Sequence, residues 1–155
     1  MVVSSMSESN SQRPKVMVSG CYDLLHAGHV VFFETASQYG DLYVCLGSDK
    51  TIQSIKGNPT RFTEAERQYI VQSIRFVHEA RVSRGGGMLD FEPEMLDIRP
   101  DYFVVNHDGG SEDKRQLCEK HGVKYIELPR TPKAGLPPRS SSGIKAALRD
   151  EGKAK

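Results

Sequence analysis

Two histidines three residues apart stand in a short glycine-containing segment near the N-terminus. The segment reads GCYDLLHAGH over residues 20–29, and its histidines are His26 and His29. If His29 lies in the first turn of a helix, both imidazoles project to one spot, because residues three apart share a helical face. Unpaired N–H groups and the positive end of the helix dipole favour an anion at the same place. Gly20 and Gly28 would let the backbone approach a phosphate, so the pattern predicts a phosphate-binding site.

Simpler roles are open for these residues. A histidine near a strand end is more often structural than catalytic, and Asp23 suits a turn or a helix cap. A His-x-x-His pair could also bind zinc, but the sequence shows no third ligand at a suitable spacing. The segment is neither a GxGxxG dinucleotide loop nor a P-loop, since no Gly-Lys-Ser/Thr follows it.

Short apolar runs alternate with helical patterns along the chain. Five runs rich in β-branched or aromatic residues are predicted strands: 15–19, 42–47, 80–83, 102–105 and 123–128. Five helical patterns are predicted helices: 28–39, 63–76, 91–97, 112–121 and 142–149. This alternation predicts an α/β fold with a doubly wound, five-stranded parallel sheet and helices on both faces. Ligands bind at the carboxyl ends of the strands in such sheets, so the loop after the first strand should hold the chemistry.

Composition limits the class of protein. The chain has 155 residues, of which 37% are hydrophobic, and its formal net charge is +1. We expect a single domain over residues 14–150, a disordered Ser-rich tail at 1–13 and a polar tail at 151–155. The near-neutral charge and the lack of tryptophan argue against a nucleic-acid binder, and no apolar run reaches the ~18 residues of a membrane span. The three cysteines lack CxxC spacing, which suits a reduced cytoplasmic protein in which Cys45 is a small buried hydrophobe.

The segment at 20–29, which continues as VVFFETA, resembles the first signature of the cytidylyltransferase-like nucleotidyltransferases, G-[TC]-[FY]-D-x-x-H-x-G-H on a Rossmann-like domain. Weaker segments in the family's order extend the resemblance from Lys15 to Leu148. It implies transfer of a nucleotidyl group from CTP or ATP to a phosphorylated small molecule, with Mg²⁺ accompanying the nucleotide, pyrophosphate released and a homodimer formed. An acceptor phosphate is already charged at pH 7 and needs no general base. The site should therefore consist of histidines, Lys, Arg, N–H groups and Mg²⁺, with few carboxylates.

The resemblance also assigns roles by position. The catalytic residues would be His26, His29 and Lys56, of which Lys56 would reach the phosphates from a flexible loop. Nucleotide contacts would come from Gly20, Cys21, Tyr22, Asp108, Arg130, Ser140, Ser141 and Ser142. Acceptor contacts would come from Asp23, Arg67 and His107. The structural alternatives are a surface lysine for Lys56, a solvated helix-face arginine for Arg67 and a flexible linker for the serines.

The chain departs from the family pattern in two places. Asn106-His107-Asp108 stands where relatives carry G-D-D or G-G-D, which leaves the acceptor open. The closing motif, R-T-x-G-[IV]-S-T-[TS], is lengthened between Arg130 and Ser140, so that either Arg130 or Arg139 could take the arginine role. The first signature is close to that of heptose-phosphate adenylyltransferases, whereas the closing motif resembles the glycerol-3-phosphate branch. Of the two enzyme activities, we favour a cytidylyltransferase slightly over a sugar-1-phosphate adenylyltransferase. The alternative from another class is a nucleotide-binding module that does not turn over its nucleotide.

Overall fold

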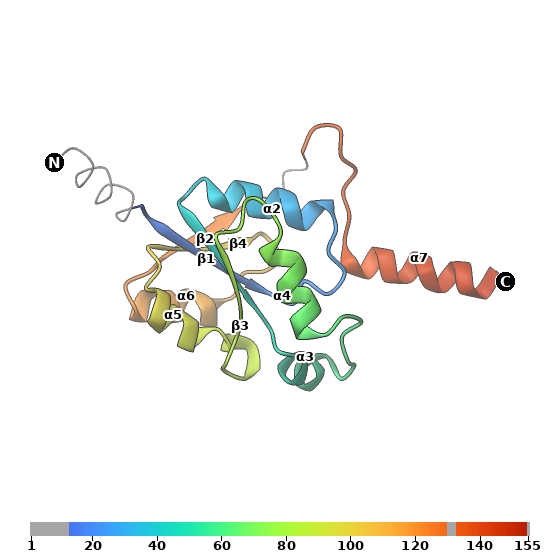
Figure 1. Ribbon diagram of the computed structural model, residues 1–155, viewed down its shortest axis with the longest axis horizontal. Coiled ribbons are helices and arrows are strands. Elements are labelled where there is room, and N and C mark those ends of the chain that lie inside the picture. The colour runs from blue at the N-terminus through green and yellow to red at the C-terminus, as the bar shows by residue number, and fades with distance from the viewer. Residues whose placement is uncertain (1–12, 130–132, 155) are drawn as a thin grey trace.

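A sheet of five parallel strands forms the centre of the protein, whose computed structural model describes residues 13–129 and 133–154 (Figure 1). The strands are β1 (Lys15–Gly20), β2 (Asp41–Leu46), β3 (Glu79–Val82), β4 (Tyr102–Asn106) and β5 (Lys124–Leu128). Their order across the sheet is β3-β2-β1-β4-β5, and every neighbouring pair is parallel. The strand order therefore reverses between β1 and β4, which confirms the predicted doubly wound, Rossmann-like sheet.

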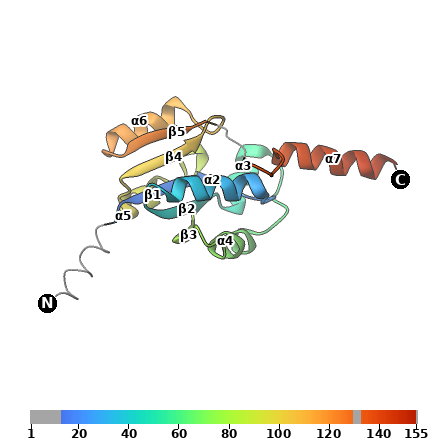
Figure 2. The same cartoon turned by 90° about the horizontal axis from the view of Figure 1, so that it is seen from above.

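Helices cover both faces of this sheet, as predicted. They are α2 (Ala27–Ser37), α3 (Asp49–Lys56), α4 (Glu64–Gln72), α5 (Glu92–Ile98), α6 (Glu112–Lys120) and α7 (Ser141–Ala154), with a 3-10 turn at Gly87–Leu89. Buried residues of α2 and α4 belong to one core cluster, and those of α5 and α6 belong to a second. α7 extends away from the body of the protein (Figures 1 and 2). Within the two described ranges, no helix is both long and apolar enough to cross a membrane.

Alternate residues of the central strand β1 supply the two halves of the core. Val16 and Val18 are fully buried in the cluster that contains Phe33 of α2. Met17 points to the opposite face and packs in the cluster that contains Phe103 and Cys45. A strand buried on both faces carries a continuous apolar run, because successive side chains point in opposite directions. The prediction that Cys45 is a small buried hydrophobe is confirmed.

The sequence pattern does not predict α3, whose eight residues are too few for a clear periodicity. Local capping defines it instead. The Ser48 hydroxyl accepts a hydrogen bond from the Thr51 N–H, and Gly57 ends the helix with φ 77°. Lys56 therefore lies in the last turn of a helix, and the predicted flexible loop is wrong.

The C-terminal ends of α4 and α7 differ most from the predicted ones. α4 ends at Gln72, before the predicted Phe76. α7 runs to Ala154, because the Lys, Ala, Leu, Arg and Glu residues after 144 are good helix formers. Residues 151–154 thus continue the helix, whereas a polar tail was expected there. Residues 1–12 of the predicted N-terminal tail lie outside the described residues.

Candidate active site

A cleft of about 610 Å³ opens at the carboxyl ends of β1, β4 and β5. Gly20 lines it from β1, Val105 and Asn106 line it from β4, and Leu128 lines it from β5. The cleft thus lies where the strand order reverses, which is the place predicted from the sequence. Its volume is within the range of pockets that enclose small-molecule ligands.

His26 and His29 hold each other in the first turn of α2. His26 is the N-cap of the helix, and its Nδ1 accepts a hydrogen bond from the Gly28 N–H at 3.0 Å. Nδ1 of His29 accepts in turn from the His26 N–H at 3.1 Å, and the two ring centroids are 3.9 Å apart. A ring nitrogen that accepts from a backbone N–H carries no proton, so each neutral ring has its N–H at Nε2. The cleft, which both histidines line, is therefore provided with two uncharged imidazole donors.

The surroundings of His29 keep its ring neutral. Burial, assisted by the neighbouring His26, lowers the pKa of His29 to about 4. Tyr22 packs edge-on against His29 with a centroid distance of 5.5 Å, and Tyr22 itself packs on Phe33 at 5.0 Å. At pH 7 His29 is thus a hydrogen-bond donor and carries no charge.

Tyr22 shapes the loop after β1 from the inside. Its φ is 54°, its ring is buried, and its hydroxyl donates to the Ser19 carbonyl at 3.2 Å. A Cβ on Gly20 would lie only 2.7 Å from Cζ of this ring. Gly20 is thus required to admit the Tyr22 ring, a different reason from the predicted close approach to a phosphate. Gly20, Cys21 and Tyr22 all line the cleft, and their contacts with a nucleotide stay a prediction.

Arg67 is not among the residues that line the cleft, although it was predicted to face the acceptor. Its side chain is fully buried and engaged by its own chain. Nη1 donates to the carbonyl oxygens of Cys21 at 2.9 Å and Gly47 at 2.8 Å, and Nε donates to that of Phe62 at 3.1 Å. Nη2 bonds to Oδ1 of Asp49 at 2.8 Å. In this structure Arg67 is a clamp between loops and makes no contact with the cleft.

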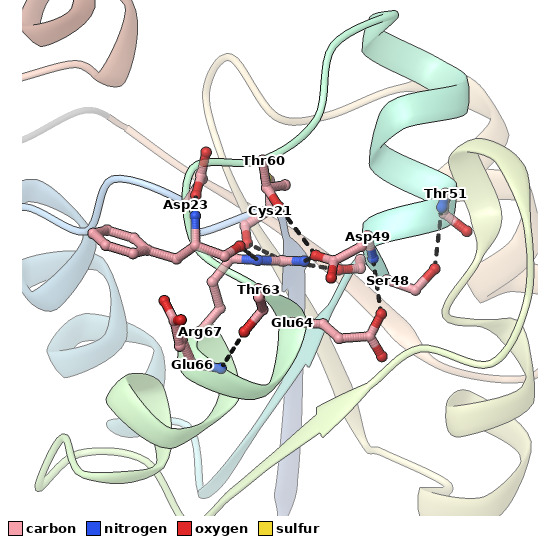
Figure 3. A network of polar contacts seen from close by, with 12 residues as sticks. Cys21, Asp23, Ser48, Asp49, Thr51, Thr60, Thr63, Glu64, Glu66 and Arg67 are labelled. Carbon is pink, nitrogen blue, oxygen red and sulfur yellow. Dashed lines mark hydrogen bonds and ion pairs between the residues drawn. The ribbon is translucent and has the colours of Figure 1, made fainter.

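Asp23 completes this clamp from the loop after β1 (Figure 3). Its carboxylate accepts hydrogen bonds from the backbone N–H groups of Arg61 at 2.8 Å and Phe62 at 2.9 Å. Asp23 does line the cleft, but both of its oxygens already hold the segment that precedes α4. Asp23 and Arg67 therefore position the loop that leads to His26. The structure places Arg67 away from the cleft, whereas the acceptor contact of Asp23 stays a prediction.

The serine triplet begins α7 and borders the same cleft. The Ser140 hydroxyl accepts from the Gly143 N–H at 3.0 Å, and the Ser141 hydroxyl contacts the Leu24 carbonyl at 3.5 Å. Ser140, Ser141 and Ser142 all line the cleft, and the alternative of a flexible linker is wrong. Since α2 also begins there, the positive ends of two helix dipoles face one cavity.

Cations outnumber carboxylates around this cavity. Among the described lining residues the cations are Lys56, Lys114, Lys133, Arg139 and Lys145, and the carboxylates are Asp23 and Asp108. Such an excess favours a polyanionic ligand. Lys114 was not predicted from the sequence. Its Nζ donates to the Gly109 carbonyl at 2.7 Å, and burial lowers the pKa of this ammonium group. It stands in an ordinary helical pattern, so no motif marks it.

The remaining predicted contacts divide between the cleft and its surroundings. Asp108 lines the cleft, whereas His107 does not. Both side chains are exposed, and Nδ1 of His107 lies 4.0 Å from Oδ1 of Asp108. Arg139 lines the cleft, and Arg130 lies outside the described residues. Across residues 13–129 and 133–154, no three His, Cys, Asp or Glu side chains gather as a metal site.

Comparisons with known proteins agree with this fold. The family model described as cytidylyltransferase-like matches residues 17–147. An FAD synthase of Aciduliprofundum boonei is 33% identical over 124 residues, which cover 78% of this chain and 80% of the relative. A glycerol-3-phosphate cytidylyltransferase of Staphylococcus aureus is 31% identical over 115 residues, covering 73% and 86%. The crystal structure of a lipopolysaccharide core biosynthesis protein from Thermoplasma volcanium shares the fold with a TM-score of 0.66 at 23% identity, over 77% of this chain and 99% of that one.

Arg67→Ala should destabilise the fold strongly. The substitution removes the donors to the buried carbonyls of Cys21 and Gly47, and buried acceptors without partners are costly. We expect the free energy of unfolding, measured by urea denaturation, to fall by about 2–4 kcal/mol. Arg61→Ala is the matched control, because this side chain is exposed, and it should cost less than about 0.5 kcal/mol. A similar small loss in both variants would contradict the clamp.

The low pKa of His29 predicts a pH-dependent contribution to stability. The folded ring titrates at about 4 and the unfolded ring near 6.5, so the unfolded state alone gains a proton between these values. The contribution of His29 is therefore complete above pH 6.5 and is lost as the pH falls toward 4, by about 2–3 kcal/mol at pH 4.5. His29→Gln keeps a capping acceptor at this position but cannot titrate. In urea denaturation the advantage of the wild type over this variant should shrink from pH 7 to pH 4.5; a constant difference would contradict the assignment.

Proposed function

Because the chain belongs to the cytidylyltransferase-like family of nucleotidyltransferases, we propose that it transfers a nucleotidyl group from a nucleoside triphosphate to the phosphate of a small-molecule acceptor. One observation carries the proposal. Two neutral imidazole donors and the N-termini of α2 and α7 meet in a single cleft whose charged lining residues are mostly cations. This is the environment that two phosphorylated reactants require, since their mutual repulsion is the main obstacle to bringing them together.

In the proposed reaction an oxygen of the acceptor phosphate attacks the α-phosphorus of the triphosphate. The new phosphorus–oxygen bond forms as the bond to the bridging oxygen breaks, and pyrophosphate leaves with that electron pair. The acceptor oxygen is already anionic, so no side chain has to remove a proton. His26 and His29 donate through Nε2–H to phosphate oxygens whose charge grows in the transition state, and their Nδ1 bonds hold the rings in place.

Cationic side chains hold the triphosphate in this scheme. Lys56 reaches the cleft from the last turn of α3, and Lys145 reaches it from the first turns of α7. Ser140, Ser141 and Ser142 add hydroxyl donors at the N-terminus of α7, where a terminal phosphate is favoured by the helix dipole. Arg139 borders the same cavity and takes the role that the family gives to an arginine.

The residues fit a Mg²⁺ that arrives with the nucleotide. Mg²⁺ often binds through one or two carboxylates together with phosphate oxygens and water. Asp108, an exposed carboxylate that lines the cleft, is the residue that would hold the ion from the protein side. When bound, Mg²⁺ supplies charge neutralisation for the leaving pyrophosphate.

For the substrates we propose ATP and FMN first. The A. boonei relative is an FAD synthase, and FAD is FMN joined through a pyrophosphate bond to AMP. Adenylyl transfer to the phosphate of FMN makes this product, and the relationship supports ATP over the CTP favoured by the sequence. The second candidate is CTP with glycerol 3-phosphate, which the S. aureus cytidylyltransferase supports at similar identity.

A pyrophosphate-release assay with Mg²⁺ tests the proposal. CTP and ATP are each combined with FMN, glycerol 3-phosphate, phosphocholine, phosphoethanolamine and several sugar 1-phosphates. We expect release with one pair, ATP and FMN, and a product whose mass equals the acceptor plus the nucleoside monophosphate less water. Release with CTP and glycerol 3-phosphate would select the second candidate. Nucleotide binding without release for any pair would contradict both and favour a non-catalytic module.

His29→Ala should lower kcat by about 10²–10³-fold in the active pair, because it removes one preorganised donor to a developing charge. The matched control is His78→Ala, whose ring packs on Tyr43 and is not part of the cleft lining. The control should keep kcat within about threefold, as surface substitutions away from such features are nearly neutral. A His29→Ala enzyme as active as the control would exclude this histidine from the mechanism.

A further inference from the structure

Residues 133–140, which lead into α7, form an arch at the edge of the cleft. Figure 1 shows it in orange, rising above α2 and descending to the start of α7. A turn shapes its beginning, where the Leu136 N–H donates to the Lys133 carbonyl at 3.0 Å and Gly135 has φ 85°. Leu136, Pro137 and Pro138 line the cleft from this arch.

Both ends of the arch are close to α2. At one end Nζ of Lys133 forms an ion pair with Oε1 of Glu34 at 2.7 Å. At the other end the Arg139 carbonyl oxygen lies 3.7 Å from the position that a Cβ would occupy on Gly28. Gly28 and Glu34 are about 9 Å apart along the helix at 1.5 Å per residue. The arch therefore spans nearly two turns at the N-terminal end of α2.

A stripe of α2 forms the wall of the cleft along this span. Gly28, Val31, Phe32 and Thr35, at the spacing that places residues on one helical face, all line the cleft. The two walls are thus largely apolar: a valine, a phenylalanine and a threonine methyl on α2, and a leucine and two prolines on the arch. The slot between them ends at the histidines of the first turn of α2. Such a slot suits a flat ring that carries a phosphate chain at one edge, because apolar faces favour the ring and donors favour the phosphates.

We propose that the Lys133–Glu34 ion pair is a latch that holds the arch over α2 and thereby forms a binding slot for the planar aromatic ring of a phosphorylated substrate. The proposal rests on the proposed function only in that a phosphorylated ligand occupies the cleft. The ring is the base of the nucleotide or the ring system of the acceptor. Lys133 and Glu34 are positioning residues, since the slot acts through Leu136, Pro137 and Pro138.

Glu34→Gln and Lys133→Gln break the latch and change the charge of the cleft in opposite directions. With the full chain, calorimetry should give a Kd for the ring-bearing ligand, among ATP, CTP and FMN, that rises about two- to fivefold in both variants, as expected for an exposed ion pair. Inorganic triphosphate has no ring, so its Kd should not rise in both the Glu34→Gln and the Lys133→Gln variant. The exchanged pair Glu34→Lys with Lys133→Glu should restore the wild-type Kd of the ring-bearing ligand.

Glu79→Gln breaks an ion pair with Arg81 that is similarly exposed and does not border the cleft, and it should leave every Kd unchanged. Leu136→Ser removes apolar surface from the arch and should also weaken the ring-bearing ligand more than inorganic triphosphate. Opposite shifts in Glu34→Gln and Lys133→Gln would mean that only charge matters and would overturn the latch. Equal effects on inorganic triphosphate, or no rescue by the exchanged pair, would overturn it as well.

The choice of ligand separates the sources of the ring. If the Kd rises only for ATP or CTP, the slot binds the base of the nucleotide. If the Kd rises only for FMN, the slot binds the ring system of the acceptor. Either result supports the slot. Unchanged affinities for all three ligands overturn it. These are binding measurements, so they give an answer even if no pair of substrates releases pyrophosphate, which would contradict the proposed function alone.

Discussion

The guanidinium of Arg67 is the contact on which the geometry of the site depends. Three segments far apart in the sequence present carbonyl oxygens to it, from Cys21 after β1, Gly47 after β2 and Phe62 before α4. Arginine suits this position because its planar fork has five donors in fixed directions and remains charged when buried. Asp49 provides the opposite charge, and hydrogen bonds from Arg67 and its other neighbours hold the pKa of this carboxyl below its ordinary value although partial burial opposes the shift. A loop that would otherwise be free to move is thereby fixed beside the sheet.

The histidine pair depends on that fixed loop. His26 begins α2 directly after it. The Gly28 N–H donates to Nδ1 of His26 and the His26 N–H donates to Nδ1 of His29, which leaves the proton of each neutral ring on Nε2. The same bonds satisfy N–H groups that the first turn of a helix leaves without partners. The same two rings therefore cap the helix through Nδ1 and, in the proposed function, donate to phosphate through Nε2–H. Neutral rings are appropriate here, because a charged pair with centroids 3.9 Å apart would repel.

The two proposals assign phosphate binding and the choice of substrate to different parts of the cleft. In the proposed function, His26 and His29 interact with the charge that every nucleoside triphosphate carries. The arch at 133–140 belongs to the stretch in which this chain is longer than the family pattern, and it contributes apolar surface to the cleft. A fold that keeps its phosphate site at the strand ends can change the substrate through such a loop, since loops tolerate insertion more readily than strands do.

The sequence by itself determined the strands, the doubly wound order and the phosphate motif, because apolar periodicity and local spacing carry that information. It also located Ser140–Ser142 at the start of a helix. It could not determine the partners of Arg67 and Asp23, since a buried guanidinium and one exposed on a helix have the same sequence pattern. It likewise did not mark α3, which depends on single capping residues, or Lys114, which no motif includes. Only the tertiary structure decided these features, because they arise where segments distant in the chain meet and exclude water.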